Sequence, residues 1–272
     1  MILTLSPSSI DNLMSCPTMY NYNSIKRLTP LEEKRDKMDR GTLFHEMLAL
    51  HYNLIINGEV PYNQIVLAVT ELAREKARND EYPIEMTEES ISNYQDYAVF
   101  YQADNWIPKF VETPFSKLIF ESEKDKIILE GRMDLIVETG EKLIFPVDHK
   151  TEEKKDQANP LSNQFMAYSW ATDSNNFVKN AVGFQKTYGP AQRFHRDIMS
   201  YTKEQLEEWR ENVIYFGLML INYIEKDHFP MNFSSCRYCK YKSICLTSKD
   251  NREFKMGSMY MVREPYDIFG SK

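Results

Sequence analysis

Up to about residue 111, the hydrophobic residues recur at the spacing of helices. Ser6 carries an oxygen that can cap a helix, and Pro7 follows it at the first helical position. Leu43 and Met47 lie on one stripe of a later segment, and His45 falls in the first turn predicted for that helix. The pattern predicts helices over residues 7–15, 41–56, 62–78 and 88–111, of which the last two form a helical insertion at about residues 60–112.

From Ser116 onward the hydrophobic pattern changes to that of strands. Segments rich in Ile, Leu, Val and Phe are separated by short polar turns, which predicts a three-stranded meander over residues 117–122, 127–137 and 142–150. A helix, a strand pair and a long helix that starts with a T-x-x-Q capping pattern are then expected over residues 160–172, 178–187, 193–200 and 202–225. This order predicts an α/β fold.

Length and composition restrict the class of protein. The 272 residues, 42% of them hydrophobic and 27% charged, suit one large folded domain or two small ones. We expect one domain at residues 1–249, followed by a polar C-terminal tail at 250–272. No apolar run approaches the roughly 20 residues of a bilayer span, so we expect no membrane contact and a reducing, cytoplasmic location. The net charge of −7 excludes a generally cationic nucleic-acid binder, and the sequence contains no motif of a phosphate-binding loop.

The third strand of the meander contains the triplet Asp148-His149-Lys150. Side chains alternate along a strand, so Asp148 and Lys150 share one face of the sheet and His149 points to the other. A carboxylate that binds metal beside a lysine is what phosphodiester hydrolysis requires, because both groups stabilise developing negative charge. A D-x-K triplet is also common at solvated strand ends, so this motif needs support from elsewhere in the chain.

The second strand supplies that support through Asp134, which precedes an apolar run and would be costly to bury without a partner. If the turn between the two strands is centred near Glu141, the residue numbers of facing residues sum to 282. Asp134 then faces Asp148, and the two carboxylates can share a divalent cation. A two-residue loop would instead make them diagonal neighbours that are still close. Gly131, three residues earlier, suits the close approach of another backbone or of a ligand, or a simple bulge.

Three further polar residues are candidates for the same site. Gln164 and Tyr168 lie four positions apart and project from one face of their predicted helix, where they could hold a phosphate or a base. They are also compatible with an ordinary helix surface. His45 could complete a Mn²⁺ or Mg²⁺ site, although a single histidine on an amphipathic helix is more often a packed or exposed residue.

The four cysteines have the spacing of a metal site. Cys236, Cys239 and Cys245 form C-x2-C-x5-C near one end of the chain, and Cys16 lies near the other. Four thiolates suffice for either a zinc ion or an iron–sulfur cluster, and the spacing does not distinguish the two, with free thiols as a third interpretation. Ligation of one centre by all four would join the terminal segments and make metal binding part of the folding free energy.

Taken in order, these motifs resemble those of the PD-(D/E)XK nuclease superfamily. More narrowly, they are similar to the RecB-like nucleases with an iron–sulfur staple, such as the AddB nuclease domain and the CRISPR-associated adaptation exonucleases. The resemblance covers residues 6–246 and is carried by Cys16, Gly41-Thr42-Leu43-Phe44-His45-Glu46, Gly131-Arg132-Met133-Asp134, Asp148-His149-Lys150, Gln164-x-x-x-Tyr168 and C-x2-C-x5-C. It implies a restriction-endonuclease-like core in which a mixed sheet is flanked by helices.

The resemblance also implies roles for individual residues. His45, Asp134 and Asp148 would bind Mg²⁺ or Mn²⁺ together with the main-chain carbonyl of His149, and Lys150 would be the catalytic lysine. The sequence departs from the family pattern in two places, because Met133 replaces a proline and Asp148 stands where many relatives have glutamate. Neither change removes a ligand.

The remaining family motifs concern DNA and the cysteines. Gln164 and Tyr168 match a helix that contacts the DNA strand and organises the site. The cysteines match ligands of a 4Fe-4S cluster, which favours iron–sulfur over Zn²⁺. Basic residues expected to form patches that face DNA are Lys109, Lys117, Arg132, Lys154, Lys155, Arg193 and Arg196.

The expected function is therefore metal-dependent hydrolysis of DNA, by an exonuclease that acts on single-stranded ends in recombination, repair or replication. Any unwinding would come from a partner such as a helicase or a recombination protein. One alternative is a catalytically silent module that binds DNA ends, against which the intact Asp134, Asp148 and Lys150 argue. A third interpretation treats the C-terminal cysteines as a zinc module for protein contacts.

Overall fold

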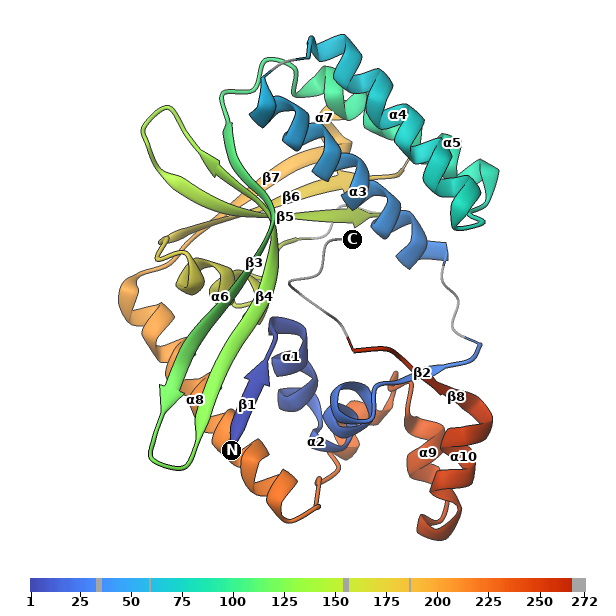
Figure 1. The fold of residues 1–272 in the computed structure, drawn as a ribbon, viewed down its shortest axis with the longest axis vertical. Coiled ribbons are helices and arrows are strands. Elements are labelled where there is room, and N and C mark those ends of the chain that lie inside the picture. Colours follow the sequence, from blue (N-terminus) through green and yellow to red (C-terminus); the bar gives the residue numbers. More distant parts are fainter. Residues whose placement is uncertain (33–35, 59, 154–156, 186, 266–272) are drawn as a thin grey trace. The chain divides into compact units, whose positions relative to one another are not determined.

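The structure is a computed structural model that describes residues 1–32, 36–58, 60–153, 157–185 and 187–265 (Figure 1). Its packing divides the chain into two compact units. The first unit consists of Met1–Lys34, Pro114–Gly131 and Glu204–Lys272, and the second consists of Arg35–Thr113 and Arg132–Lys203. Within the described residues, no helix is long and apolar enough to cross a membrane.

The strands of the meander belong to a mixed six-stranded sheet with the order β1-β4-β5-β6-β7, and β3 also pairs with β4. The pairs β1·β4 and β5·β6 are parallel, whereas β4·β5 and β6·β7 are antiparallel. The strands are β1 (Ile2–Leu5), β3 (Ile107–Glu121), β4 (Lys126–Glu138), β5 (Ile144–Glu152), β6 (Asn176–Gly183) and β7 (Phe194–Ser200). The predicted mixed sheet flanked by helices is confirmed.

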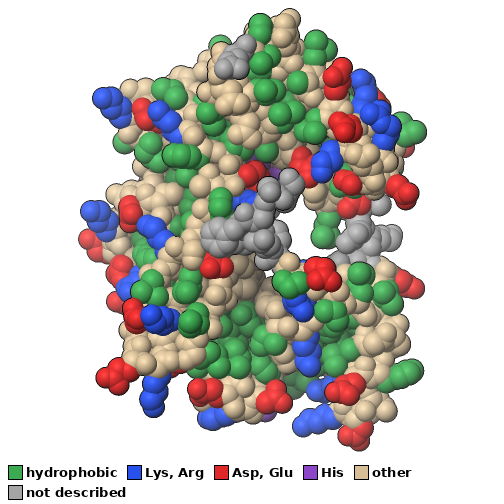
Figure 2. Space-filling model, in the orientation of Figure 1, with side chains coloured by type: hydrophobic (Ala, Val, Ile, Leu, Met, Phe, Trp, Pro, Cys, Tyr) green, Lys and Arg blue, Asp and Glu red, His purple; other side chains and the backbone are tan. Residues whose placement is uncertain are grey.

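Three helices of the second unit pack together against its part of the sheet. They are α3 (Asp36–Asn57), α4 (Tyr62–Asn79) and α5 (Ile84–Phe100), which lie side by side in Figure 1. Phe44 and Met47 of α3 and Tyr94 of α5 are completely buried in the core that results. On their outer side, Arg74 pairs with Glu88, and Figure 2 shows basic and acidic side chains interspersed over this part of the surface.

Several predicted helix boundaries in this unit are wrong, among them the start of α5, which is Ile84 rather than Glu88. The helix that carries His45 begins at Asp36, so His45 lies in its third turn rather than its first. Acidic side chains such as Asp39 favour a helix N-terminus without contributing to the apolar stripe, which explains the late predicted start. The last helix of the insertion ends at Phe100, not at Val111, and the residues from Ile107 belong to β3. Pro108 argues against a helix that continues to residue 111, because proline breaks a helix interior.

The short helix α6 (Asn163–Ala171) follows β5 and contacts both β5 and β6. It connects two parallel strands, which need a crossover of this kind. The helix begins three residues later than predicted and buries Phe165, which stacks on Phe177 of β6. A single turn, α7 (Pro190–Arg193), precedes β7.

The first unit joins the two terminal regions of the chain. Ser6 caps α1 by accepting a hydrogen bond from the backbone N–H of Ser9, as the sequence predicts. Part of the expected polar tail is folded, because Tyr260 is buried against Tyr241 and its strand β8 pairs with β2. The elements are α1 (Pro7–Ser15), α2 (Pro17–Tyr20), η1 (Asn21–Ile25), β2 (Leu28–Pro30), α8 (Lys203–Glu225), η2 (Phe233–Cys236), α9 (Lys242–Leu246), η3 (Lys249–Asn251), α10 (Arg252–Met259) and β8 (Tyr260–Val262).

One glycine is required by the close approach of backbone segments in the second unit. A Cβ on Gly183 would lie 3.1 Å from the carbonyl oxygen of Arg193 and 3.2 Å from its Cα. We expect Gly183→Ala to lower the free energy of unfolding by about 1–3 kcal/mol, the usual cost of overpacking. Gly189→Ala is the control, because a Cβ there meets no atom within 4 Å. Equal midpoints in urea for the two variants would contradict this account.

Candidate active site

The two aspartates of the predicted site lie on neighbouring strands of the second unit. In the β4·β5 pair, Leu135 faces Val147, and the numbers of these two residues sum to 282 as predicted. The next positions along the strands are Asp134 and Asp148. Asp148 is almost completely buried, at 1% exposure, and Asp134 is half-buried. The register inferred from the turn is therefore confirmed.

Lys150 and Gln164 surround the buried carboxylate of Asp148. The Nζ of Lys150 lies 2.8 Å from Oδ2 of Asp148, and it donates a hydrogen bond of 2.9 Å to Oε1 of Gln164. The amide of Gln164 donates in turn to Oδ1 of Asp148 at 2.7 Å. These three side chains form a closed triangle in which both oxygens of Asp148 have a polar neighbour.

Tyr168 links the same helix to β4. Its hydroxyl donates a hydrogen bond of 2.8 Å to the main-chain carbonyl of Arg132 and lies 3.3 Å from the amide nitrogen of Gln164. Gln164 and Tyr168 therefore project from one face of α6, as their spacing predicts. Tyr168 holds α6 against the strand that carries Asp134.

His45 reaches the other aspartate from α3. Its Nδ1 lies 3.3 Å from Oδ2 of Asp134, which also accepts a hydrogen bond of 2.8 Å from the backbone N–H of His149. Burial alone would lower the pKa of His45, but the charge and hydrogen bond of Asp134 outweigh burial and raise it. Burial would raise the pKa of Asp134, yet His45 and the N–H of His149 lower it to about 2.

The two aspartates have opposite pKa shifts. Burial raises the pKa of Asp148 to about 6, and the negative charge of Asp134 adds to this effect, while Lys150 opposes it. Burial acts on Lys150 in the opposite sense, but the charge of Asp148 dominates and raises the pKa of the lysine. Ionisation of a buried carboxyl group is costly, but it becomes favourable when a cation is bound beside the group.

The side chain of His149 points away from Asp148, as the alternation along β5 predicts. Its Nδ1 accepts a hydrogen bond of 2.8 Å from the amide of Asn180, and its ring stacks on Tyr52 at 5.7 Å. Burial lowers the pKa of His149 to about 3, so the ring is neutral. The same amide of Asn180 also donates to the hydroxyl of Tyr97 at 3.0 Å.

Sequence reasoning missed two residues near the site. Glu112, on β3, forms with His45 and Asp134 a group whose potential ligand atoms all lie within 4.8 Å of one another. No signal in the sequence identified it, because the predicted helix extended to residue 111. Asn180 was also missed, because an asparagine within an apolar strand carries no motif, although a buried amide requires partners.

The four cysteines come together in the first unit. Cys16, Cys236, Cys239 and Cys245 all line one pocket, together with residues such as Tyr22. Burial raises the pKa of Cys245, and the other three thiols contribute in the same direction through their charge. The thiols are thus close enough to interact although they come from opposite ends of the sequence.

The predicted basic patches facing DNA are wrong in part. Arg196 is largely buried, with its guanidinium between the rings of Tyr101 and Trp106 and paired with Asp104. It therefore contributes to the core of the second unit. Lys109, Arg132 and Arg193 have acidic neighbours in Glu138, Glu112 and Asp96, whereas Lys154 and Lys155 lie outside the described residues.

A mixed sheet that presents D-x-K on one strand opposite an aspartate on the next is the arrangement of a nuclease. Residues 4–246 match the family model of the PD-(D/E)XK nuclease superfamily, and the chain belongs to this superfamily. Nucleases of this superfamily use divalent metals, and the group of His45, Glu112 and Asp134 has donors of the appropriate chemistry.

Several solved structures are similar to the chain. The crystal structure of "Putative exonuclease" from Eubacterium rectale matches over 88% of this chain and 87% of that chain, with a TM-score of 0.51 and 11% identity. The crystal structure of SSO0001 matches over 89% and 85%, with a TM-score of 0.44 and 14% identity. No curated protein matches the sequence. At 11% identity, the likeness to the first of these structures concerns the fold alone.

We expect Asp148→Asn to stabilise the metal-free protein at pH 8. The pKa of Asp148 in the folded protein, about 6, exceeds the value of 3.8 for an unperturbed aspartate, so the wild type loses stability as the pH rises between these values. The gain is about 2–3 kcal/mol at pH 8, since one pKa unit corresponds to about 1.4 kcal/mol. It disappears below pH 4. Thermal unfolding in EDTA at several pH values measures it.

Asp134→Asn is the matched comparison, with the opposite expected sign. Because the pKa of Asp134 is lowered to about 2, its charge stabilises the folded protein above pH 4, and this contribution is lost as the pH falls through about 2. Its replacement therefore lowers stability at pH 8. Shifts of the same sign in the two variants would contradict the opposite pKa directions.

Proposed function

We propose that the protein is a deoxyribonuclease that depends on Mg²⁺ or Mn²⁺ and degrades single-stranded DNA from an end. The observation that carries this proposal is the triangle of Asp148, Lys150 and Gln164, which lies beside Asp134. A site with a lysine, two carboxylates and a histidine has every group type that hydrolysis of a phosphodiester requires.

The residues present suit a divalent cation of this kind. His45, Asp134, Asp148 and the main-chain carbonyl of His149 would hold it, and carboxylate and carbonyl oxygens are the ligands that Mg²⁺ and Mn²⁺ prefer. The raised pKa of Asp148 is consistent with a side chain placed to meet a positive charge. The bound cation would polarise the phosphoryl oxygen and lower the pKa of a water molecule.

The other side chains would act on the substrate directly. The ammonium of Lys150 would stabilise the negative charge that develops on the phosphate, because it is already held beside Asp148 and loses little entropy in the reaction. Gln164 would orient both Lys150 and Asp148, and Tyr168 would keep α6 in place against β4. These roles follow from the hydrogen bonds that each side chain makes.

Two observations support the narrower assignment to RecB-like exonucleases. The chain combines the Gln164-x-x-x-Tyr168 helix with the cysteine set, and a protein of similar fold from Eubacterium rectale carries an exonuclease name. Within this proposal, the enzyme acts in recombination, repair or replication and takes DNA ends from a helicase or a recombination partner.

We further propose that Cys16, Cys236, Cys239 and Cys245 bind a 4Fe-4S cluster. The four cysteines line one pocket of the first unit, although Cys16 lies 220 residues from the nearest of the other three. Four thiolates in one pocket have the ligand chemistry of an iron–sulfur cluster. The match of their positions to the iron–sulfur ligands of the RecB-like nucleases supports the cluster over Zn²⁺.

Lys150→Met is expected to abolish cleavage of end-labelled single-stranded DNA. Removal of one positioned donor to a developing charge typically costs about 100- to 1000-fold in kcat, and the methionine retains most of the packing of the lysine. Protein purified without oxygen is incubated with labelled single- and double-stranded DNA and Mg²⁺ or Mn²⁺. Products resolved from each labelled end give the polarity.

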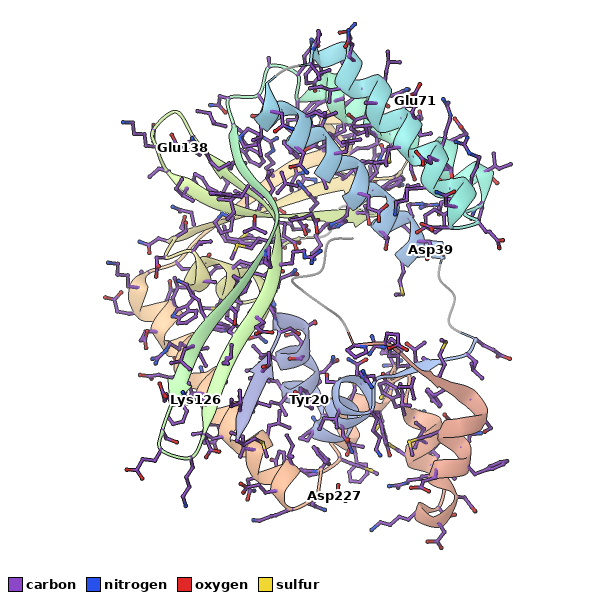
Figure 3. All side chains as sticks on the ribbon, viewed as in Figure 1. Tyr20, Asp39, Glu71, Lys126, Glu138 and Asp227 are labelled. Atoms are coloured by element: carbon purple, nitrogen blue, oxygen red, sulfur yellow. The ribbon has the colours of Figure 1, made fainter. Side chains whose placement is uncertain are left out.

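Lys126→Met is the control, because Lys126 lies on the same sheet and is similarly exposed but belongs to the first unit (Figure 3). It should cleave like the wild type. If the wild-type protein is folded, contains iron and binds DNA but cleaves neither substrate, the nuclease proposal is overturned. That outcome would favour the silent module that binds DNA ends.

Cys239→Ala is expected to lose iron and to lower the thermal unfolding midpoint. A cluster held by cysteines from both ends of the sequence contributes its binding free energy to folding. Anaerobic wild-type protein should contain four irons per chain and absorb visible light. Tyr238→Ala is the control, because Tyr238 lies between two of the cysteines but is 86% exposed. Zinc without iron in the wild type would refute the cluster.

A further inference from the structure

A third acidic side chain approaches the site from β3, outside the motifs of the sequence. One atom each from His45, Glu112 and Asp134 forms a group in which all distances are within 4.8 Å, and all three residues are half-buried. In the described part of the chain, this is the one set of three such side chains that is compact enough to hold an ion. We propose that Glu112 is a further ligand of the divalent cation, an inference that rests on the proposed nuclease function.

The backbone of β3 is unusual at this position. Glu112 has a φ of 47°, in the left-handed region, although it lies within a strand. For a residue other than glycine, such a conformation costs about 1–3 kcal/mol and persists where the surrounding structure requires it. The strand therefore departs from regular geometry at the residue whose carboxylate lies beside His45 and Asp134.

Arg132 offers a competing account of Glu112. Its guanidinium nitrogen lies 3.9 Å from the carboxylate, which is within ion-pair range. A charge-assisted hydrogen bond between such groups is much shorter, about 2.7–2.9 Å. The carboxylate of Glu112 therefore lies in ion-pair range of Arg132 and also within 4.8 Å of a potential ligand atom of His45 and of Asp134.

The combined donor set has a consequence for metal preference. The imidazole of His45 suits transition metals, whereas the three carboxylates of Glu112, Asp134 and Asp148 suit Mg²⁺ and Mn²⁺ alike. Mg²⁺ is usually held by one or two carboxylates and keeps several water molecules. A site that offers His45 and Glu112 in addition to Asp134 and Asp148 should therefore bind Mn²⁺ more tightly than Mg²⁺. His45 sets this preference, and Glu112→Gln should weaken the binding of both metals.

The test measures Mn²⁺ binding to the full chain by calorimetry and by the electron paramagnetic resonance of free Mn²⁺, without DNA. Glu112→Gln keeps the shape of the side chain and removes its charge, and we expect at least tenfold weaker binding. Even the substitution of a residue that only orients a metal ligand weakens metal binding about 10- to 100-fold. Glu112→Asn is a second variant, because asparagine adopts the left-handed region more readily than glutamate.

Glu138→Gln is the matched control. Glu138 lies on β4 (Figure 3), its side chain has the same exposure of 26% as that of Glu112, and it pairs with Lys109 at 3.0 Å. This variant should bind Mn²⁺ like the wild type. Unfolding of each metal-free variant shows whether a loss of affinity reflects a loss of fold.

The outcomes separate this inference from the function on which it rests. If Asp134→Asn abolishes Mn²⁺ binding while Glu112→Gln and Glu112→Asn bind like the wild type, Glu112 is not a ligand and the nuclease proposal stands. If the wild type neither binds Mn²⁺ nor cleaves DNA, both proposals fail. Weaker binding in both Glu112 variants, with folded protein and an unchanged Glu138→Gln, supports Glu112 as a ligand.

Discussion

The proposed site depends on one buried negative charge, that of Asp148. Ionising this carboxylate inside the sheet is unfavourable, as its raised pKa indicates, and the neighbouring polar groups offset only part of the cost. Lys150 and Gln164 are held in place by that charge, and Gln164 in turn belongs to the helix that Tyr168 fixes to β4. The ionised Asp148 thereby lowers the stability of the metal-free protein, and a bound cation would compensate for this loss. Such a compromise between stability and activity is common.

Much of this arrangement could be predicted from the sequence, because it is determined by residues that are close together in the chain. The turn after Glu138 limits the register of β4 and β5, so a turn centred near Glu141 was enough to place Asp134 opposite Asp148. Likewise, a separation of four on a helix fixed the common direction of Gln164 and Tyr168. In both cases the relevant geometry is set within a few residues, and neighbouring elements do not alter it.

The features that the sequence did not reveal arise from contacts between distant segments. Glu112 adopts a left-handed backbone within β3, and no motif accompanies that conformation. Arg196 was expected on a surface that faces DNA, because a charged residue on a strand normally lies in solvent. Two aromatic rings and Asp104 make its burial favourable instead, and they come from the segment between α5 and β3. Such compensation depends on the tertiary fold.

The pairing of the first and last parts of the chain also affects how the protein is made. Cys236, Cys239 and Cys245, which line one pocket with Cys16, are synthesised at least 220 residues after it. At about 5–20 residues per second, the first of these three cysteines follows Cys16 after roughly 11–44 s. The strand β2 waits similarly for β8. The segment that carries Cys16 and β2 can therefore complete its packing only after Cys236 and β8 have been synthesised.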